Sequence, residues 1–405
     1  MRIAVIGSGY VGLNLAVLAS SENHTVSVID INESLVEKLS SGISHIEGIE
    51  DRTLKDLLAN EKISFSSDFK VLNESNVVVI AVPTPLYENK NPDLSSLDAA
   101  MLSISENIAD KTLVINESTS FPGTLRNLEK FISNRNQDKR IYFAVCPERI
   151  DPGNNTWKIN NTPRILGGIG NESVNKASAF YDSLRTPVIV VNSPEIAETA
   201  KLFENTFRYV NIALANELAK ICLAMDIPVL EVLDAADSKP FGFMRFNPSL
   251  GVGGHCIPVD PFYLTWVSKQ FGHTPKLIEM SNEIIRDNTK LIVDLVRKEI
   301  GGSFLGKRIQ VIGVTYKQGI SDIRETPALL LIQMLDSEGA TITWHDPLVK
   351  SWRGDTSSPI SNDIDFGLIY TAHPEIDLNL WSKVEFPVRY CGPGKIPNFK
   401  SIFEK

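Results

Sequence analysis

The sequence lacks the features that mark secreted, membrane and nucleic-acid-binding proteins. It has only four cysteines, far apart and without a CxxC pair, which argues against a disulfide framework or a structural zinc site. No apolar run is long enough to span a bilayer, and strand-like sequence from Arg2 onward leads us to expect no signal peptide. The net charge is −9 without a dense Lys/Arg run, so nucleic acid and anionic membranes are not expected partners. These absences favour a cytoplasmic protein without a metal site.

The length indicates more than one domain. A chain of 405 residues exceeds what one hydrophobic core serves, and 43% apolar with 22% charged residues is an ordinary globular composition. We therefore expect two or three domains.

The first thirty residues carry a dinucleotide-binding pattern. They predict a strand, a glycine-rich turn, a helix and a second strand, with Gly7, Gly9 and Gly12 in the turn. Glycines there let the backbone approach a pyrophosphate at a helix N-terminus. Asp30, eighteen residues past the last of these glycines, can accept ribose hydroxyls and would repel a 2′-phosphate. The pattern therefore favours NAD over NADP.

Further apolar strands are expected, each followed by polar residues. They cover 76–82, 112–116 and 141–145. Thr119 and Glu148 follow the last two, where the carboxyl ends of parallel strands bind ligands. Both are candidate site residues, and the alternative for each is a helix cap or turn residue.

One long helix is expected after Ser193. The sequence Ser193-Pro194-Glu195 is typical of a helix start, and no glycine or proline follows before Pro228. Apolar residues recur three or four positions apart and form one face, comprising Ile196, Ala200, Phe203, Phe207, Val210, Leu214 and Leu218. Such a helix joins domains or forms a dimer core, and we predict both.

Another face of this helix carries Lys201, Asn205 and Arg208. Their spacing aligns them on the helix surface. This stripe is either a solvated face or a wall that contacts a polar substrate.

The last third repeats the opening pattern. A second unit of strand, loop, helix and strand is expected over 307–346. The last strand of this unit ends at Asp346. The glycine fingerprint is absent, and Val314-Thr-Tyr-Lys317 stands in its place. Lys317 and Arg324 add cations suited to phosphate, so this region should bind a different, nucleotide-like ligand. The predicted fold is α/β, with two Rossmann-like doubly wound domains joined by a helical middle region that contains one long central helix.

A glycine-rich segment over 251–260 surrounds one cysteine, Cys256, and ends at Asp260. Pro261 fits the first turn of a helix, whose N-terminus would favour the nucleophilic thiolate. The alternative is a buried, unreactive cysteine in a glycine-rich turn.

Seven motifs in order give the chain a clear resemblance. They are GSGYVGL, AVPTP, ESTSFPGT, CPERIDPGN, ENTFRYVNIALANELA, GVGGHCIPVDPFY and TYKQGISDIRETPAL. With these, the chain resembles the UDP-glucose/GDP-mannose dehydrogenase superfamily over essentially its whole length. The resemblance implies an NAD-dependent enzyme that oxidises the C6 hydroxyl of a nucleotide-activated hexose twice, to a uronic acid.

The resemblance also suggests a branch. UDP-glucose enzymes read GGSC, whereas this chain reads GGHC, with His255 before the cysteine. The GGHCIPVDP reading resembles branches that act on UDP-N-acetylhexosamines. PERIDPGN together with the PFGFM segment looks most like UDP-N-acetylglucosamine 6-dehydrogenases of surface-polysaccharide biosynthesis. The alternatives are a UDP-N-acetylmannosamine or UDP-glucose 6-dehydrogenase, or a non-catalytic sugar-nucleotide-binding homologue. The implied domains are an NAD-binding domain over 1–192, a central helical domain with the cysteine loop and dimer contacts over 193–290, and a UDP-sugar-binding domain over 291–405.

Residue roles follow from the same resemblance. Cys256 would trap the aldehyde as a thiohemiacetal that becomes a thioester, and Lys201 with Asn205 would stabilise the oxyanion. Asp260 would orient water or take up protons, while Glu148 and Thr119 would act in thioester hydrolysis. The implied cofactor-binding residues are Gly7, Gly9, Tyr10, Val11, Gly12, Asp30, Pro83, Thr84, Thr119 and Arg324. The implied substrate-binding residues are Glu148, Arg149, Lys201, Asn205, Arg208, Gly253, His255 and Lys317.

We consider three roles for His255. It tunes Cys256 as a base or an imidazolium, contacts the acetamido group of the substrate, or packs.

Overall fold

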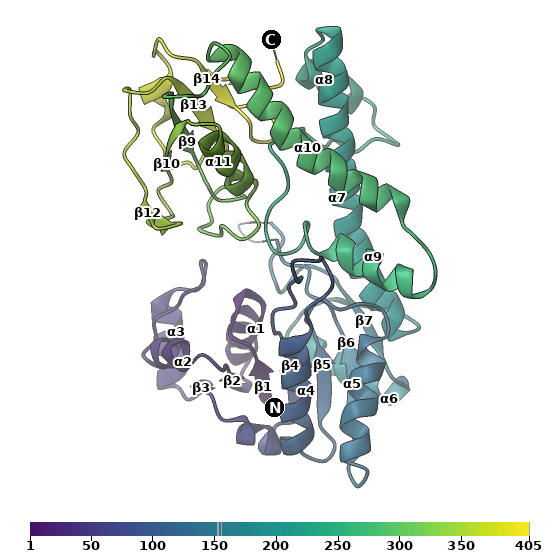
Figure 1. Cartoon of the computed structure of the whole chain (residues 1–405). Helices are drawn as coiled ribbons and strands as arrows, with labels where there is room; N and C mark the ends of the chain where they lie inside the picture. Colours follow the sequence, from purple (N-terminus) through teal and green to yellow (C-terminus); the bar gives the residue numbers. More distant parts are fainter. Residues whose placement is uncertain (152–153, 155, 405) are drawn as a thin grey trace. The chain divides into compact units, whose positions relative to one another are not determined.

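The structure is a computed structural model that describes residues 1–151, 154 and 156–404. Pro152 and Gly153 of the CPERIDPGN motif lie outside the described residues. The chain forms two compact units, Met1–Glu204 with Phe262–Gly272, and Asn205–Pro261 with His273–Lys405. Figure 1 traces both along the chain.

The first unit is built on a sheet that has eight strands within the described ranges, in the order β3-β2-β1-β4-β5-β6-β7-β8. The strands are β1 (Arg2–Ile6), β2 (Thr25–Ile29), β3 (Ile63–Ser66), β4 (Val77–Ile80), β5 (Leu113–Asn116), β6 (Tyr142–Val145), β7 (Arg164–Gly168) and β8 (Val188–Val190). Neighbours pair in parallel, except that β7 runs antiparallel to β6. The order reverses between β1 and β4, and such a switch point is where open parallel sheets bind ligands.

Helices cover this sheet on both faces. They are α1 (Tyr10–Ser21), α2 (Glu33–Ser40), α3 (Asp51–Ala59), α4 (Ser95–Asn107), α5 (Thr124–Arg135) and α6 (Asn171–Ser183), with a 3₁₀ turn, η1 (Phe69–Glu74). Successive β1 residues enter different cores, because Val5 packs in one buried apolar cluster and Ile6 in the other. A strand buried on both faces explains why β1 and β4 are continuously apolar in sequence.

The second unit holds a parallel sheet of five strands in the described residues, ordered β10-β9-β13-β14-β15. Its strands are β9 (Arg308–Ile312), β10 (Thr341–His345), β13 (Phe366–Ile369), β14 (Val388–Tyr390) and β15 (Lys400–Ser401), beside a hairpin of β11 (Ser351–Trp352) and β12 (Asp355–Thr356). Its helical elements are α8 (Val229–Asp237), α10 (Lys276–Glu299), α11 (Pro327–Ser337) and η2 (Leu378–Trp381). The predicted fold class is confirmed.

Helix α7 (Pro194–Met225) has 32 residues and contains the boundary between the units, while α9 (Asp260–Gln270) begins beside the other boundary. The predicted apolar face of α7 stays largely exposed, with Phe203 61% and Leu214 59% accessible. The buried side carries Leu202, Tyr209 and Ala213 instead. Periodicity thus identified residues that share a face, but the described residues leave much of that face exposed.

No helix among the described residues combines the length and apolar character that a membrane crossing requires.

Candidate active site

The turn after β1 has the shape that a bound dinucleotide needs. Gly7 has a φ of +99°, and a Cβ there would lie 2.4 Å from the Ala81 carbonyl oxygen. A Cβ on Gly12 would lie 1.9 Å from the Gly7 oxygen, so this glycine permits close helix-strand packing. At Gly9, by contrast, no described atom beyond its chain neighbours comes within 4 Å of the Cβ position. The open side of the turn therefore leaves room for a pyrophosphate, as NAD requires.

Asp30 is held beside this turn. Its Oδ2 accepts hydrogen bonds from the Ser8 backbone N–H at 2.9 Å and the Ser8 hydroxyl at 2.5 Å, while Oδ1 accepts from the Asn32 N–H at 3.0 Å. The half-buried carboxylate is thus oriented at the end of β2, where the ribose of NAD would lie. An oriented carboxylate at this position fits the ribose hydroxyls of NAD.

The turn after β4 carries Pro83 and Thr84. The Thr84 carbonyl accepts a hydrogen bond from the Tyr263 hydroxyl at 3.0 Å, and the Ser118 hydroxyl accepts one from the Val82 N–H at 2.9 Å. These bonds fix the turn at the switch point and tie it to the segment that carries Thr119.

Glu148 lies at the carboxyl end of β6, half-buried. Its side chain accepts a hydrogen bond from the Ile150 N–H. Burial raises the pKa of Glu148, and the positive charges of Lys201 and Arg164 act in the opposite direction. The net pKa of Glu148 is raised, and a carboxyl group with a raised pKa is suited to take up a proton from water.

Arg149 is engaged by the protein itself. Its guanidinium forms two hydrogen bonds with Glu204, at 2.6 and 3.1 Å, and donates a third to the Pro163 carbonyl at 2.7 Å. In this structure Arg149 anchors its loop to α7, so its predicted contact with substrate stays a prediction. Glu204 was not anticipated from the sequence, although it opens the ENTFRYVN motif.

The cysteine loop and its partners lie in the second unit. Cys256 is half-buried, and its carbonyl accepts hydrogen bonds from the Val259 and Asp260 N–H groups at 3.0 and 2.8 Å, at the start of α9. The loop rests on the ring of Tyr316. A Cβ on Gly253 or Gly254 would come within 2.5 or 2.8 Å of that side chain. The glycines thus allow the backbone to lie against Tyr316, which sequence reasoning did not anticipate.

Asp260 and Asn205 lie together. The Asn205 Nδ2 donates to the Asp260 Oδ2 at 2.6 Å, and Asp260 is 1% exposed. Two predicted catalytic residues, 55 positions apart in sequence, are therefore in direct contact.

His255 is in contact with Arg324, whose Nη2 lies 3.0 Å from the His255 Nδ1. A guanidinium only donates hydrogen bonds, so Nδ1 is the acceptor in this contact. Arg324 is held in turn by Asp322, with contacts of 2.6 to 3.1 Å. The three interpretations of His255 stay predictions. Asp322 stands in the same motif as Arg324 but was not predicted.

The remaining predicted residues vary in exposure. Lys317 is half-buried, and its carbonyl accepts a hydrogen bond from the Thr315 hydroxyl at 3.1 Å. Arg208 is exposed on α7.

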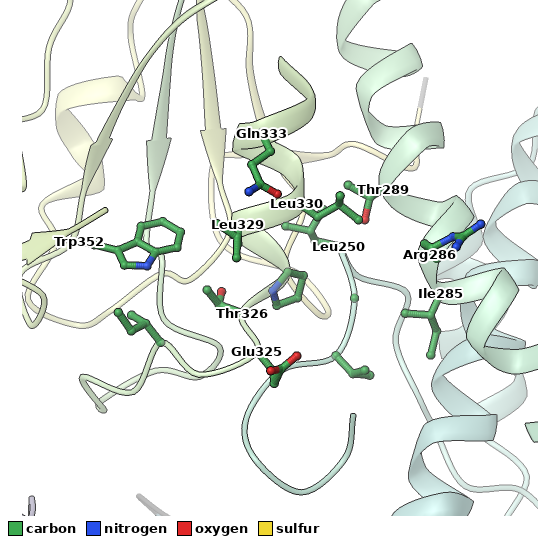
Figure 2. A pocket seen from close by; sticks show the side chains of 14 residues that line it. Leu250, Ile285, Arg286, Thr289, Glu325, Thr326, Leu329, Leu330, Gln333 and Trp352 are labelled. Atoms are coloured by element: carbon green, nitrogen blue, oxygen red, sulfur yellow. The ribbon is translucent and has the colours of Figure 1, made fainter. Parts of the chain in front are cut away.

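A separate cavity of about 310 Å³ lies between the start of α11 and α10. Figure 2 shows its largely apolar wall, with Leu250, Leu329 and Trp352, together with polar Glu325 and Gln333. Its described lining contains none of the predicted site residues.

Comparison with known proteins identifies the family. The UDP-glucose/GDP-mannose dehydrogenase family matches in its NAD-binding domain over 1–185, its central domain over 195–286 and its UDP-binding domain over 310–388. The chain is 33% identical over 398 residues to a UDP-N-acetyl-D-mannosamine dehydrogenase of Pyrococcus horikoshii, covering 96% of this chain and 94% of that protein. It is 34% identical over 368 residues to a UDP-N-acetyl-D-glucosamine 6-dehydrogenase of Pseudomonas aeruginosa, covering 87% of this chain and 84% of that protein.

A solved structure agrees with these matches. A UDP-D-ManNAc dehydrogenase from Pyrococcus horikoshii superposes with a TM-score of 0.89 at 31% identity, covering 100% of this chain and 99% of that one. The chain therefore belongs to the UDP-glucose/GDP-mannose dehydrogenase family and is an NAD-dependent nucleotide-sugar dehydrogenase.

Proposed function

We propose that this enzyme oxidises the C6 hydroxyl of a UDP-N-acetylhexosamine twice, to the uronic acid, with UDP-N-acetylglucosamine as the preferred substrate. The observation that carries the proposal is His255, next to Cys256 in the sequence, whose Nδ1 lies 3.0 Å from the Arg324 Nη2. Its Nε2–H is a donor suited to the carbonyl oxygen of an acetamido group, which UDP-glucose lacks. Relatives named for UDP-N-acetyl-D-mannosamine and UDP-N-acetyl-D-glucosamine support the acetamido assignment. UDP-N-acetylmannosamine is the alternative substrate.

The reaction requires two hydride transfers, and two NAD molecules in succession accept them. The thiolate of Cys256 adds to the C6 aldehyde and gives a thiohemiacetal, whose oxidation gives a thioester. Water then attacks the thioester carbon, the C–S bond breaks, and the acid leaves with the thiolate restored. Holding the aldehyde covalently prevents its escape between the two oxidations.

The other residues support these steps. Lys201 and Asn205, one helical turn apart on α7, stabilise the oxyanion at C6, and Asp260 accepts the Asn205 amide that it orients. Glu148 takes the proton of the attacking water, and Thr119 positions that water. Gly253, Lys317 and Arg208 contact the sugar nucleotide.

We also propose that the enzyme is a cytoplasmic homodimer divided as 1–192, 193–290 and 291–405. The exposed apolar face of α7 supports the dimer, since Phe203, Phe207 and Leu214 are 61%, 40% and 59% accessible. All four cysteines lie in the described residues without a disulfide, as is usual in a reducing compartment.

A substrate panel tests the assignment. UDP-N-acetylglucosamine should yield two NADH per sugar nucleotide. The rate of NADH formation should be lower with UDP-N-acetylmannosamine and lowest with UDP-glucose. His255→Ser should lower kcat/KM for the N-acetylated sugar about tenfold or more, with little effect on UDP-glucose. A faster reaction with UDP-glucose in the wild type would contradict the acetamido assignment.

The covalent step has its own test. Cys256→Ser should form no uronic acid, because an alcohol is a far weaker nucleophile than a thiolate. Mass spectrometry measures the uronic acid in reactions of the variant and the wild type that have formed the same amount of NADH. Uronic acid formation at the wild-type rate in this variant would exclude covalent catalysis.

A further inference from the structure

A buried ion pair lies in the first unit, beside the strand end that carries Glu148. Arg164 begins β7 and Glu117 follows β5, and the Arg164 Nη1 lies 2.7 Å from the Glu117 Oε1. Their side chains are 2% and 0% exposed. The Tyr181 hydroxyl donates to the same Oε1 at 2.6 Å. Two opposite charges and a phenol are thus buried together at this sheet.

Stability alone is a poor reason for this arrangement. Removing both ions from water is costly, and a buried pair offsets that cost only when its remaining polar atoms are also satisfied. Here both terminal nitrogens of Arg164, Nη1 and Nη2, and the Glu117 Oε2 form no hydrogen bond within the described part of the chain. Apolar residues of similar volume would serve the sheet as well.

The pair is linked to Glu148 by backbone and by charge. The Glu148 N–H donates to the Glu117 carbonyl at 3.4 Å, and the Cys146 N–H donates to the Asn116 carbonyl at 3.0 Å, so the ends of β5 and β6 are joined. Glu148 is also faced by Lys201 of α7 and Tyr10 of α1. Lys201 and Arg164 lower the pKa of Glu148, and Glu117 raises it.

We propose that Arg164 and Glu117 are positioning residues for Glu148. Arg164 keeps the Glu148 carboxylate ionised and ready to take a proton from the water that attacks the thioester. Glu117 holds the guanidinium in place and partly neutralises it, so that Glu148 can release that proton afterwards. This inference rests on the proposed function, specifically on the role of Glu148 in hydrolysis.

Removing the positive charge of Arg164 and removing the negative charge of Glu117 should shift the pH profile of uronic acid release in opposite directions, which makes the prediction specific. Glu148 acts as a base, so the rate of uronic acid release rises with pH as its carboxylate ionises. Arg164→Met should move the midpoint of that rise up by about one pH unit, and Glu117→Gln should move it down. Arg164→Lys retains the charge and should restore the wild-type midpoint. The measurement is single-turnover release of uronic acid from UDP-N-acetylglucosamine across pH, in the full chain with NAD.

A surface triad supplies the control. Glu172 contacts Arg140 and accepts a hydrogen bond from Tyr142 at 2.8 Å, repeating the Glu–Arg–Tyr chemistry at an exposed site. Glu172→Gln should leave the midpoint unchanged. In a Glu148→Gln background neither buried substitution should shift the profile further.

The outcomes separate this inference from the proposed function. If Glu148→Gln retains the wild-type profile, the hydrolytic role of Glu148 fails. If Glu148→Gln abolishes release but the two buried variants leave the midpoint unmoved, or shift it the same way, the positioning role is overturned. Should Arg164→Met show no cooperative unfolding transition, the downward shift in Glu117→Gln decides the question alone.

Discussion

The same strand-turn-helix-strand pattern occurs in both units, but the surroundings of its turn differ between them. In the first unit, the β1 turn is closed by Asp30, whose Oδ2 accepts the Ser8 N–H at 2.9 Å. In the second unit, the β9 turn is closed by Asp346, whose Oδ2 accepts the Val314 N–H at 2.9 Å. The two acids have the same place in their strand-turn-helix-strand units, but the side chains around them differ.

The difference lies in what surrounds each acid. Asp30 is half-buried beside the open position at Gly9. Asp346 is 1% exposed and lies 3.2 Å from the His373 Nε2, while the Thr315 hydroxyl lies 2.8 Å from the same nitrogen. The Gly319 N–H donates to the His373 Nδ1 at 3.1 Å, which ties the ring to the loop after β9. Side chains of the second unit thus hold Asp346 in a buried hydrogen-bonded network, whereas Asp30 borders an open position.

The largest expected effect is a loss of NAD affinity when a larger side chain closes the first turn. Gly12→Val should reduce NAD affinity at least about a hundredfold, because its side chain would overlap the Gly7 carbonyl and displace α1. Fluorescence titration with NAD measures this. Binding of UDP-N-acetylglucosamine to the same variant, which uses the second unit, should change little. Retention of wild-type NAD affinity would contradict the role given to the turn.

The second turn should respond in stability rather than in cofactor binding. Asp346→Asn should lower the free energy of unfolding by about 2–4 kcal/mol, since it weakens a buried, charge-assisted hydrogen-bond network. Denaturant unfolding measures the loss, and NAD affinity should be unchanged. A fall in NAD affinity without a stability loss would reverse the assignment of the two turns.

The pH dependence of stability sharpens the same point. Burial raises the pKa of Asp346, but hydrogen bonds from His373 and the Val314 N–H outweigh it, and the net pKa is lowered. A lowered folded-state pKa contributes stability that is present above the unfolded value of about 3.9 and is lost as pH falls through the folded value. Wild type should therefore lose this contribution below about pH 4, and Asp346→Asn should lack that part of the acid dependence. Identical acid unfolding curves would exclude Asp346 as a contributor.

The smallest effect is expected at Gly9. Gly9→Ala should leave the free energy of unfolding within about 0.5 kcal/mol of wild type, because its φ of −66° suits alanine and the Cβ position is open. NAD affinity should nevertheless fall about tenfold, because the methyl group would enter the path of the pyrophosphate. Calorimetric titration and thermal unfolding on one sample separate the two. A stability loss without an affinity change would mean that Gly9 serves packing only.

Local patterns allowed much of the fold to be predicted. The strands expected from Arg2 and Lys307 onward occur as β1 and β9, and Ser193 precedes the predicted long helix. These elements were predictable because strand apolarity, glycine turns and helix starts depend on neighbours in sequence. The antiparallel β7 was not predicted, because it is short, begins with Arg164 and ends in two glycines. The residue that pairs with Arg164, Glu117, is 47 positions away.

The sequence by itself determined the chemistry that each segment can offer, because residue type and spacing specify a thiol in a glycine loop, an acid after a strand and a lysine on a helix. The tertiary structure alone decided the state of those groups. The contact partner of His255 is Arg324, 69 positions away, and the environment of Glu148 depends on Lys201, Arg164 and Glu117 from other elements. The physical reason is that burial and charge act through space, where sequence distance has no bearing on the energy.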